Sequence, residues 1–388
     1  MSGRVTMKFL HTADWHLGKI IYQRSMIDDQ RIMLNQLKNI LLQHHVDVLL
    51  VAGDIYDRSI PTVDAVELLD EFLFDIVENH HINVVMISGN HDHADRLGFA
   101  SRLLLNRGLS IITQIEVPLR KLTFQDEFGE INLYGCPFFK PVDVRNLGFE
   151  DVRHFDEGMG LLMEHTDIDE SVRNLLMTHH FISSNSEVIQ SESEMPLSVG
   201  GSDQIGYNHF IPFDYVALGH LHAPQKIGLP SIRYSGSLLK YSVDEAKQHK
   251  GCMLIEMKEK GNLTQTFIPL LPHRDIRWIE GMFDDICKNP IGNTEDYVAI
   301  RLLDTYYIDS ALQIVRSVYP NALTLEYKQN QTDIYSTSIP HIDVGSKSDL
   351  ELFEEFYQFI QSEQLEDSLK DLFVDMLKEV SNRNHEAH

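Results

Sequence analysis

The sequence predicts an α/β fold, because short apolar runs alternate with stretches of helical periodicity. Five apolar runs each end in a polar cluster, and the stretches 26–45 and 62–79 carry apolar residues at helical spacing. Runs of this kind are typical of buried strands, and strands that alternate with helices are typical of layered α/β folds. Ligands of such sheets lie beyond the carboxyl ends of the strands, which is where the five polar clusters fall.

The five predicted strands are each followed by Asp, Asn or His. With the polar cluster in parentheses, they are 7–10 (11–16), 46–51 (52–54), 84–87 (88–92), 175–177 (178–180) and 215–218 (219–222). A single pair such as Asp14 and His16 occurs often by chance. Five clusters at five strand ends would require chance to supply both the residue type and the location five times. We therefore predict a metal centre.

The rest of the chain continues the first domain and then adds two smaller parts. The first domain spans 1–272. It ends with a polar loop at 183–207 and three β patterns at 234–242, 252–256 and 263–269. A small α/β domain is predicted at 273–340, with strand, helix and strand at 297–303, 310–318 and 322–327. The tail 345–388 is predicted to be helical from 349 to 380, with an apolar stripe and a net charge of −7.

Composition excludes several classes of protein. The chain of 388 residues has a net charge of −25, which argues against binding of nucleic acid by bulk basicity. Three widely spaced cysteines provide neither a disulfide framework nor a cysteine zinc site. We find no signal peptide and no apolar run near the roughly 18 residues that cross a bilayer. These observations predict a soluble protein of the reducing cytoplasm, with no membrane partner.

The polar clusters predict a site for two cations. Asp14 and His16 are two residues apart, as are His220 and His222, and such residues point the same way on an extended segment. Asp54 is the natural bridge, because a carboxylate has two oxygens. Asn90 adds an oxygen ligand without adding charge. These nitrogen and oxygen ligands suit manganese, iron or zinc.

The predicted charges point to a reaction. Two cations that face two carboxylates leave a positive pocket, which attracts an anionic ester into an acidic protein. Such a pair activates water and stabilises in-line displacement at phosphorus. His91 directly follows Asn90, and its ring is expected on the substrate side as a proton donor. Gly89 is expected to let the chain turn sharply there.

The series of motifs resembles the calcineurin-like metallophosphoesterases. The motifs are Asp-x-His at 14–16, Gly-Asp-x-x-Asp at 53–57, Gly-Asn-His-Asp at 89–92, a histidine after the fourth strand and Gly-His-x-His at 219–222. The segments 12–18, 52–57 and 234–237 further resemble the SbcD-type nuclease subunits of bacterial SbcC–SbcD complexes. The resemblance covers residues 7 to about 269 strongly and the small second domain loosely.

The resemblance implies a fold and a ligand set. The fold is a β-sandwich flanked by helices. The small α/β domain at 273–340 would be a capping domain, and the tail follows it. The first metal would take Asp14, His16, Asp54 and His222, and the second Asp54, Asn90, His179 and His220. His91 would be the catalytic histidine that binds no metal, and both metals would be Mn²⁺. His179 is preferred over His180, because the downstream Ser-Glu-Ser-Glu and Gly200-Gly201 keep their family offset from it.

The resemblance also implies an activity and partners. The activity is that of a 3′ to 5′ exonuclease on duplex ends and an endonuclease on single strands and hairpins, in DNA repair, recombination and replication. An SbcC-type ATPase would bind the tail, and the capping domain would touch DNA. Helices near 62–79 and 96–105 would pair two subunits into a homodimer within a heterotetramer.

Other interpretations remain open from the residues themselves. The motifs do not choose the ester, so a calcineurin-like phosphatase or a small-molecule phosphodiesterase is the alternative enzyme. A degenerate scaffold without catalysis is disfavoured, since every expected ligand type is present. The apolar stripe of the tail fits either a partner or its own domain. His11 is expected to be a core histidine, and His93 and His180 packing or supporting groups.

Overall fold

The computed structural model describes residues 6–184, 188–194 and 203–328, together with isolated residues between 350 and 376. The chain divides into two compact units, Met1–Tyr327 and Lys328–His388. Within the described residues, no helix combines the length and apolar character that crossing a membrane requires.

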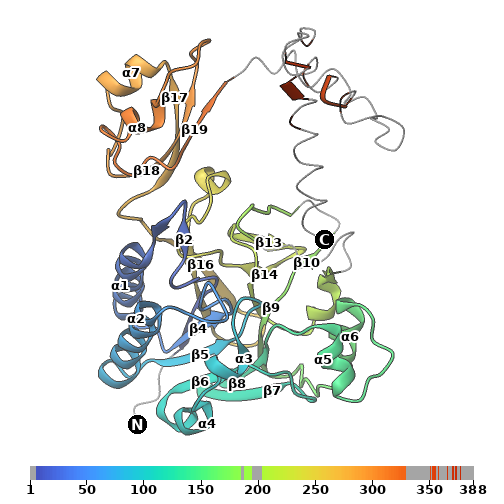
Figure 1. The fold of residues 1–388 in the computed structure, drawn as a ribbon. Coiled ribbons are helices and arrows are strands. Elements are labelled where there is room, and N and C mark those ends of the chain that lie inside the picture. Colours follow the sequence, from blue (N-terminus) through green and yellow to red (C-terminus); the bar gives the residue numbers. More distant parts are fainter. Residues whose placement is uncertain are drawn as a thin grey trace. The chain divides into compact units, whose positions relative to one another are not determined.

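Two mixed six-stranded sheets form the centre of the first unit (Figure 1). The first sheet has the order β16 (Leu263–Pro269), β15 (Gly251–Met257), β1 (Met7–Thr12), β4 (Val48–Ala52), β5 (Asn83–Ile87) and β6 (Leu109–Ile112). The second has the order β13 (Gln225–Ile227), β14 (Leu229–Tyr234), β12 (Tyr215–Gly219), β9 (Arg173–His179), β8 (Gly129–Cys136) and β7 (Arg120–Asp126).

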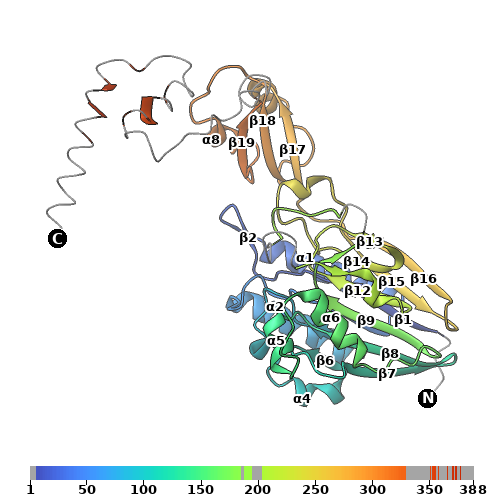
Figure 2. The same cartoon turned by 90° about the vertical axis from the view of Figure 1, so that its right-hand side faces the viewer.

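The two sheets pack face to face, and helices cover the outer face of each. Along β4, Val48 and Leu50 join the core between the sheets, whereas Leu49 and Val51 join the core under the helices. Strands buried on both faces have continuous apolar sequences, which explains why these runs predicted strands correctly. Figures 1 and 2 show the helices on the two sides: α1 (Ile27–Gln43), α2 (Val63–Phe74), α5 (Pro141–Asn146) and α6 (Phe155–Glu164).

The predicted sandwich flanked by helices is confirmed, with three differences in its elements. The hairpin of β7 and β8 was not anticipated, because β7 alternates partly buried and exposed residues instead of forming an apolar run. The expected strand at 234–242 is wrong. β14 ends at Tyr234, and Gly236 then turns the chain in a left-handed conformation (φ 79°). The expected helix at 62–79 is α2 continued by a π-helical turn, Asp75–Asn79.

A three-stranded parallel sheet follows the sandwich. It contains β17 (Ile276–Gly281), β18 (Tyr297–Leu302) and β19 (Thr324–Tyr327), with α7 (Phe283–Lys288) and α8 (Ala311–Val315). The strands at 297–303 and 322–327 were expected, whereas β17 and α7 were not, and α8 is shorter than expected. Asp29 of α1 binds this part, because its carboxylate accepts from Arg274 (2.6 Å) and from the hydroxyl of Tyr297 (2.7 Å).

The shorter elements mostly connect the sandwich strands. They are β2 (Ile20–Ile21), β3 (Arg24–Ser25), α3 (Ala94–Leu97), α4 (Ser101–Leu104), β10 (Ile182–Ser183), β11 (Ile205–Gly206) and 3-10 turns at Leu105–Arg107, Tyr207–Phe210 and Asp244–Lys247.

Only scattered residues of the predicted helical tail are described, and the rest of 345–388 lies outside the described residues. The described ones are helical, apart from Leu365. The ring of Phe353 stacks on that of Phe373 at 4.0 Å, and Lys370 pairs with Glu354 at 2.9 Å. Part of the apolar stripe therefore packs within the tail itself, while Leu372 and Met376 stay exposed.

Candidate metal centre

The polar clusters that follow the five predicted strands meet at one edge of the sandwich. β1, β4 and β5 are neighbours in the first sheet, and β9 and β12 are neighbours in the second. The two sheets therefore bring together side chains from segments that are more than 200 residues apart. All eight predicted site residues lie in this region: Asp14, His16, Asp54, Asn90, His91, His179, His220 and His222.

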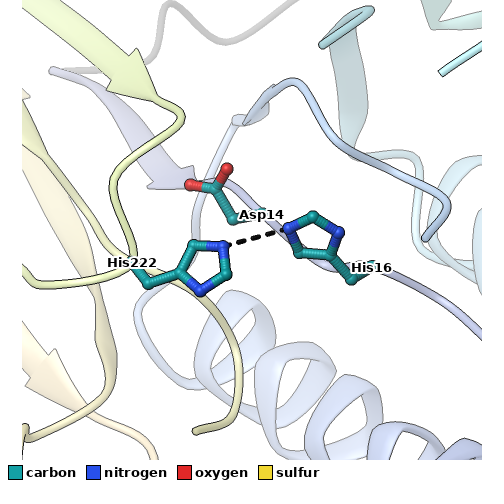
Figure 3. Close-up of side chains that lie close together, drawn as sticks. All are labelled: Asp14, His16 and His222. Carbon is teal, nitrogen blue, oxygen red and sulfur yellow. Dashed lines mark hydrogen bonds between the residues drawn. The ribbon is translucent and has the colours of Figure 1, made fainter. Parts of the chain in front are cut away.

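Asp14, His16 and His222 form the first group of candidate ligands (Figure 3). One potential ligand atom from each lies within 4.8 Å of the other two. The Nε2 atoms of His16 and His222 are 3.1 Å apart, and all three side chains are buried. This group contains three of the four ligands predicted for the first metal.

Asp54, Asn90, His179 and His220 form the second group. The Oδ1 atom of Asn90 is 3.0 Å from His179 Nε2 and 3.2 Å from His220 Nδ1. Asp54 Oδ2 lies 3.3 Å from His179 Nε2 and 3.7 Å from His16 Nε2. Asp54 therefore adjoins both groups, which is the position that a bridging carboxylate requires.

His91 lies beside the cluster with its ring partly exposed. Its Nδ1 donates to the carbonyl of Asp57 (3.0 Å), and its Nε2 lies 3.9 Å from Asp54 Oδ2. Its backbone N–H donates to Asp54 Oδ1 (2.9 Å). Asp57, His16 and His91 form a further close group of potential ligand atoms. Sequence reasoning assigned no role to Asp57, although the Gly-Asp-x-x-Asp motif contains it.

The side chains converge for a different reason from the expected one. Asp14 and His16 do not lie on extended backbone, because both adopt left-handed conformations (φ 52° and 46°). Asp54 does the same (φ 50°), and His220 has a φ of 110°. Strained backbone of this kind clusters at functional sites, where the surrounding structure stabilises it. Tight turns after the strands, and not strand alternation, direct these side chains inward.

Two glycines permit the close packing of the cluster. A Cβ atom on Gly53 would lie 2.3 Å from the ring of His179, and one on Gly89 would lie 2.1 Å from the carboxylate of Asp54. Gly53 also has a left-handed φ of 88°. Gly89 was expected to provide a sharp turn, but the structure shows that it provides space for Asp54.

The buried charges in the cluster depend strongly on one another. Burial and the nearby charge of Asp54 raise the pKa of Asp14 well above its usual value. Burial opposes the charge of Asp54 too, but His179 holds the pKa of Asp54 well below its usual value. His179 is also buried, and the carboxylates of Asp54 and Asp14 raise its pKa to about 9. A positive charge among these carboxylates is therefore strongly favoured.

The residues fit a pair of divalent cations. The donors are carboxylate, amide and imidazole atoms without sulfur, which suits manganese, iron or zinc. His16 Nδ1 is buried and has no hydrogen-bond partner among the described residues. The Nδ1 of His179 donates to the carbonyl of Ala52 (2.8 Å), so Nε2, which faces Asp54, is the atom that would bind a cation in place of a proton. Lone pairs and carboxylates thus converge on the same small volume.

A buried ion pair supports His222, and sequence reasoning missed it. The Nδ1 of His222 donates to Glu245 Oε1 (3.0 Å), because an ionised carboxylate only accepts. Lys250 donates to Glu245 Oε2 (2.6 Å) and to the carbonyl of His222 (2.8 Å). Glu194 accepts from the backbone N–H of His222 (2.7 Å). This support holds the His222 ring with Nε2 toward the cluster.

Asp92 supports the loops in a similar way. Its carboxylate accepts from the backbone N–H groups of Ile55 (3.1 Å), Tyr56 (3.0 Å) and Gly89 (2.9 Å). Asp92 thus links the turn after β4 to the turn after β5. The Gly-Asn-His-Asp motif contained Asp92, but its role depends on a loop 37 residues away.

His180 and His11 lie outside the cluster. His180 points away from it, because its ring lies against Phe138 and Phe139, and its Nδ1 bonds to Thr178 Oγ1 (3.0 Å). His11 is fully buried and bonds to the hydroxyl of Tyr215 (2.9 Å) and the carbonyl of Leu218 (3.1 Å). His11 is therefore a core histidine, as expected.

The fold and the site fit one class of protein, the metallophosphoesterases. The family model described as calcineurin-like phosphoesterase matches residues 7–224. The model described as type 5 capsule protein repressor C-terminal domain matches residues 272–360.

Curated relatives identify the chain more narrowly. The SbcD component of the nuclease SbcCD from Staphylococcus epidermidis is 32% identical over 97% of this chain and 100% of its own length. Its counterpart in Staphylococcus saprophyticus is 34% identical over 92% of this chain and 94% of its own. The chain therefore belongs to the calcineurin-like phosphoesterase family and, within it, to the SbcD group of nuclease subunits.

Solved structures resemble the chain at a greater distance. A dimetal phosphatase from Danio rerio is 11% identical, with a TM-score of 0.40 over 69% of this chain and 98% of that one. GAP50 of Plasmodium, described as the anchor in the inner membrane complex, is 11% identical, with a TM-score of 0.42 over 83% of this chain and 97% of that one. The family assignment rests on the sequence matches alone.

Proposed function

We propose that this chain is a DNA nuclease that hydrolyses phosphodiester bonds with two divalent cations. The 3′ to 5′ exonuclease activity on duplex ends, the endonuclease activity on single strands and hairpins, and the preference for Mn²⁺ are parts of this proposal. The observation that carries it is the buried cluster in which Asp54 adjoins both ligand groups. The two staphylococcal relatives, named as components of the nuclease SbcCD, support DNA as the substrate.

The proposed ligand sets follow from the two groups of side chains. Asp14, His16, Asp54 and His222 would hold the first cation. Asp54, Asn90, His179 and His220 would hold the second, with His179 favoured over His180 by its position. Bound divalent cations supply Lewis acidity and lower the pKa of water.

His91 is the proposed proton donor to the leaving oxygen. Its hydrogen bond to the carbonyl of Asp57 places the proton of the neutral ring on Nδ1 and fixes the ring orientation. Nε2 then faces the cluster and can hold a second proton for transfer. Because the side chain is 11% exposed, it can approach a substrate that enters from solvent.

Cleavage of single-stranded DNA by the purified chain with Mn²⁺ tests this proposal. We expect cutting that a chelator abolishes. His91→Ala should lower the rate by about 10²- to 10⁴-fold, the usual contribution of a general acid, and should retain both metals by elemental analysis. The matched control is His93→Ala, since His93 is exposed and caps no helix through its side chain.

Two results would count against the assignment. Metal loss in His91→Ala would show that His91 is a metal ligand. This outcome is a real alternative, because His91 lies close to His16 and Asp57. Faster hydrolysis of a phosphomonoester than of DNA would favour the alternative, a calcineurin-like phosphatase.

The proposed partner is an SbcC-type ATPase that binds the acidic tail. The described part of the tail exposes Leu372 (57%) and Met376 (59%), and residues 345–388 carry a net charge of −7. Deletion of 345–388 should abolish association with the ATPase and change manganese-dependent cutting of single strands by less than about twofold, since the metal centre lies in the other unit. Co-elution of the truncated chain with the ATPase would show that the tail is not the docking segment.

The proposed homodimer uses helices near 62–79 and 96–105. Exposed apolar side chains occur on both stretches, and such groups are typical of protein interfaces. They are Val63 (71%), Val66 (43%), Phe74 (61%), Phe99 (82%) and Leu103 (79%).

A further inference from the structure

A cavity with a basic rim lies outside the metal-ligand cluster. It has a volume of about 550 Å³ and is lined by residues of β14, β15, β16 and the 3-10 turn at Asp244–Lys247. The buried Met253 and the ring of Phe267 provide apolar surface. Arg233, Lys247 and His249 provide the basic groups. The cavity therefore combines an apolar wall with positive charge.

Arg233 is a cation that lacks a counterion among the described residues. Within that part of the chain, its buried Nε has no hydrogen-bond partner, and its Nη1 contacts only the sulfur of Met253 (3.7 Å). No carboxylate in the described ranges forms an ion pair with it. An uncompensated charge at a partly buried position is costly, and an anion bound beside it would remove that cost. The missing partner is notable in a chain with 58 acidic residues.

The other charges of the cavity do not neutralise Arg233. Lys247 and His249 are exposed, and neither pairs with a carboxylate of the described residues. Asp244 is the one acidic residue among the described residues that line the cavity. Its carboxylate already accepts from the hydroxyl of Ser242 and the backbone N–H of Glu192. Hydrogen bonds from these neutral donors leave the charge of Asp244 in place, but Arg233 and Lys247 outnumber it, so the lining keeps an excess of positive charge.

The cavity adjoins the segment that follows His222. Ala223 lines it and immediately follows His222. Hydrogen bonds hold part of its wall together, because the side-chain amide of Gln225 donates to the carbonyl of Ile189 (2.7 Å) and accepts from its N–H (3.0 Å). Two residues further on, Ser191 contacts Glu245, the partner of His222. A ligand in the cavity would therefore lie near His222, one of the proposed metal ligands.

We propose that this cavity binds a nucleotide, with its phosphate at Arg233 and Lys247 and its base against Met253 and Phe267. The guanidinium fork matches phosphate oxygens, and the volume suits a small molecule. The choice of a nucleotide over other anions with a flat apolar body rests on the proposed function. The nucleotide comes from one of two sources, a free mononucleotide or the end of a DNA strand.

Calorimetric titration of the full chain with dTMP, in the presence of EDTA, tests the proposal without the metals. Inorganic phosphate should bind at least tenfold more weakly than dTMP, because it cannot use the apolar wall. Arg233→Met should weaken dTMP binding by about tenfold or more, the factor expected for one charge-assisted hydrogen bond. Lys247→Gln should weaken it two- to fivefold. The matched control is Lys258→Gln, at the opposite end of β15, which should change it less than twofold.

A pentathymidylate strand distinguishes the two sources. If Arg233→Met weakens binding of both the strand and dTMP, a strand end occupies the cavity; if it weakens dTMP binding alone, the free nucleotide does. The proposal is wrong if dTMP does not bind, if phosphate binds as tightly, or if neither variant changes dTMP affinity.

Folding and activity controls keep these outcomes separate. Arg233→Met removes an unpaired charge beside Met253, so its melting temperature should be no lower than that of the parent chain. Should that variant fail to fold, the exposed Lys247 still decides the outcome. Manganese-dependent cutting is measured on the same proteins, so dTMP binding without DNA cleavage would contradict the proposed function and leave the cavity assignment in place.

Discussion

His222 and His91 both pack against the ring of His16, at centroid distances of 5.0 and 4.8 Å, but the protein holds them differently. The ring, N–H and carbonyl of His222 each have a partner, in Glu245, Glu194 and Lys250. The ring of His91 has one, the carbonyl of Asp57.

The difference fits the two roles proposed for these histidines. A metal ligand must keep its lone pair in one direction, and the charged partners of His222 would orient its ring in this way. A proton donor must reach the substrate, and the position of His91 near solvent, with a single hydrogen bond to its ring, suits that proposed role. The extent of support around each histidine thus matches its proposed role.

Replacement of Asp54 should break both sides of the cluster and have the largest effect. We expect Asp54→Asn to lose both ions together and to cut no DNA at a detectable rate, because the carboxylate adjoins His16, His179 and the backbone of His91. Elemental analysis measures the ions. Retention of one ion at full occupancy would argue against a bridge. The control is Asp95→Asn, an exposed aspartate of α3.

Replacement of Glu245 should affect the His222 side alone. Glu245→Gln should weaken metal binding by about 10- to 100-fold, the usual effect of removing a partner of a ligand histidine. It should also lower the free energy of unfolding by about 3–5 kcal/mol, because Lys250 stays buried without its counterion. Burial alone would raise the pKa of Glu245, but Lys250 and His222 hold it below its usual value.

A double variant separates these two effects. Adding Lys250→Met should restore much of the stability measured by thermal unfolding, whereas metal affinity should stay low. The control is the exposed Glu192→Gln. If the double variant binds metal normally, the carboxylate serves stability and does not orient His222.

His180, the second residue of the doubled histidine, should show the smallest effect on metal binding. His179→Ala should lose metal, whereas His180→Ala should keep it and lose about 1–3 kcal/mol of unfolding free energy, because its ring packs against Phe138 and Phe139. Metal content and thermal unfolding of the two variants decide which histidine is the ligand. Metal loss in His180→Ala alone would reverse the ligand assignment.

The strands were predictable where burial was uniform, and less so elsewhere. β4 and β9 are buried at every position, so their apolar runs were visible in the sequence. β7 has one solvated face, and a search for apolar runs missed it. The segment 234–242 has strand-like residues, but its backbone turns at Gly236 to approach His222. The strand preference of the local sequence therefore gave a wrong prediction next to the site.

The sequence by itself determined which residues gather at the strand ends, because a chemically demanding site needs particular side chains at fixed positions in short motifs. It also determined the layered fold, through the apolar runs. Only the tertiary structure decided how those side chains are aimed and supported. Left-handed turns aim Asp14 and His16, and Glu245 and Lys250 reach His222 across the chain. Such contacts depend on packing between distant segments, which leaves no local pattern in the sequence.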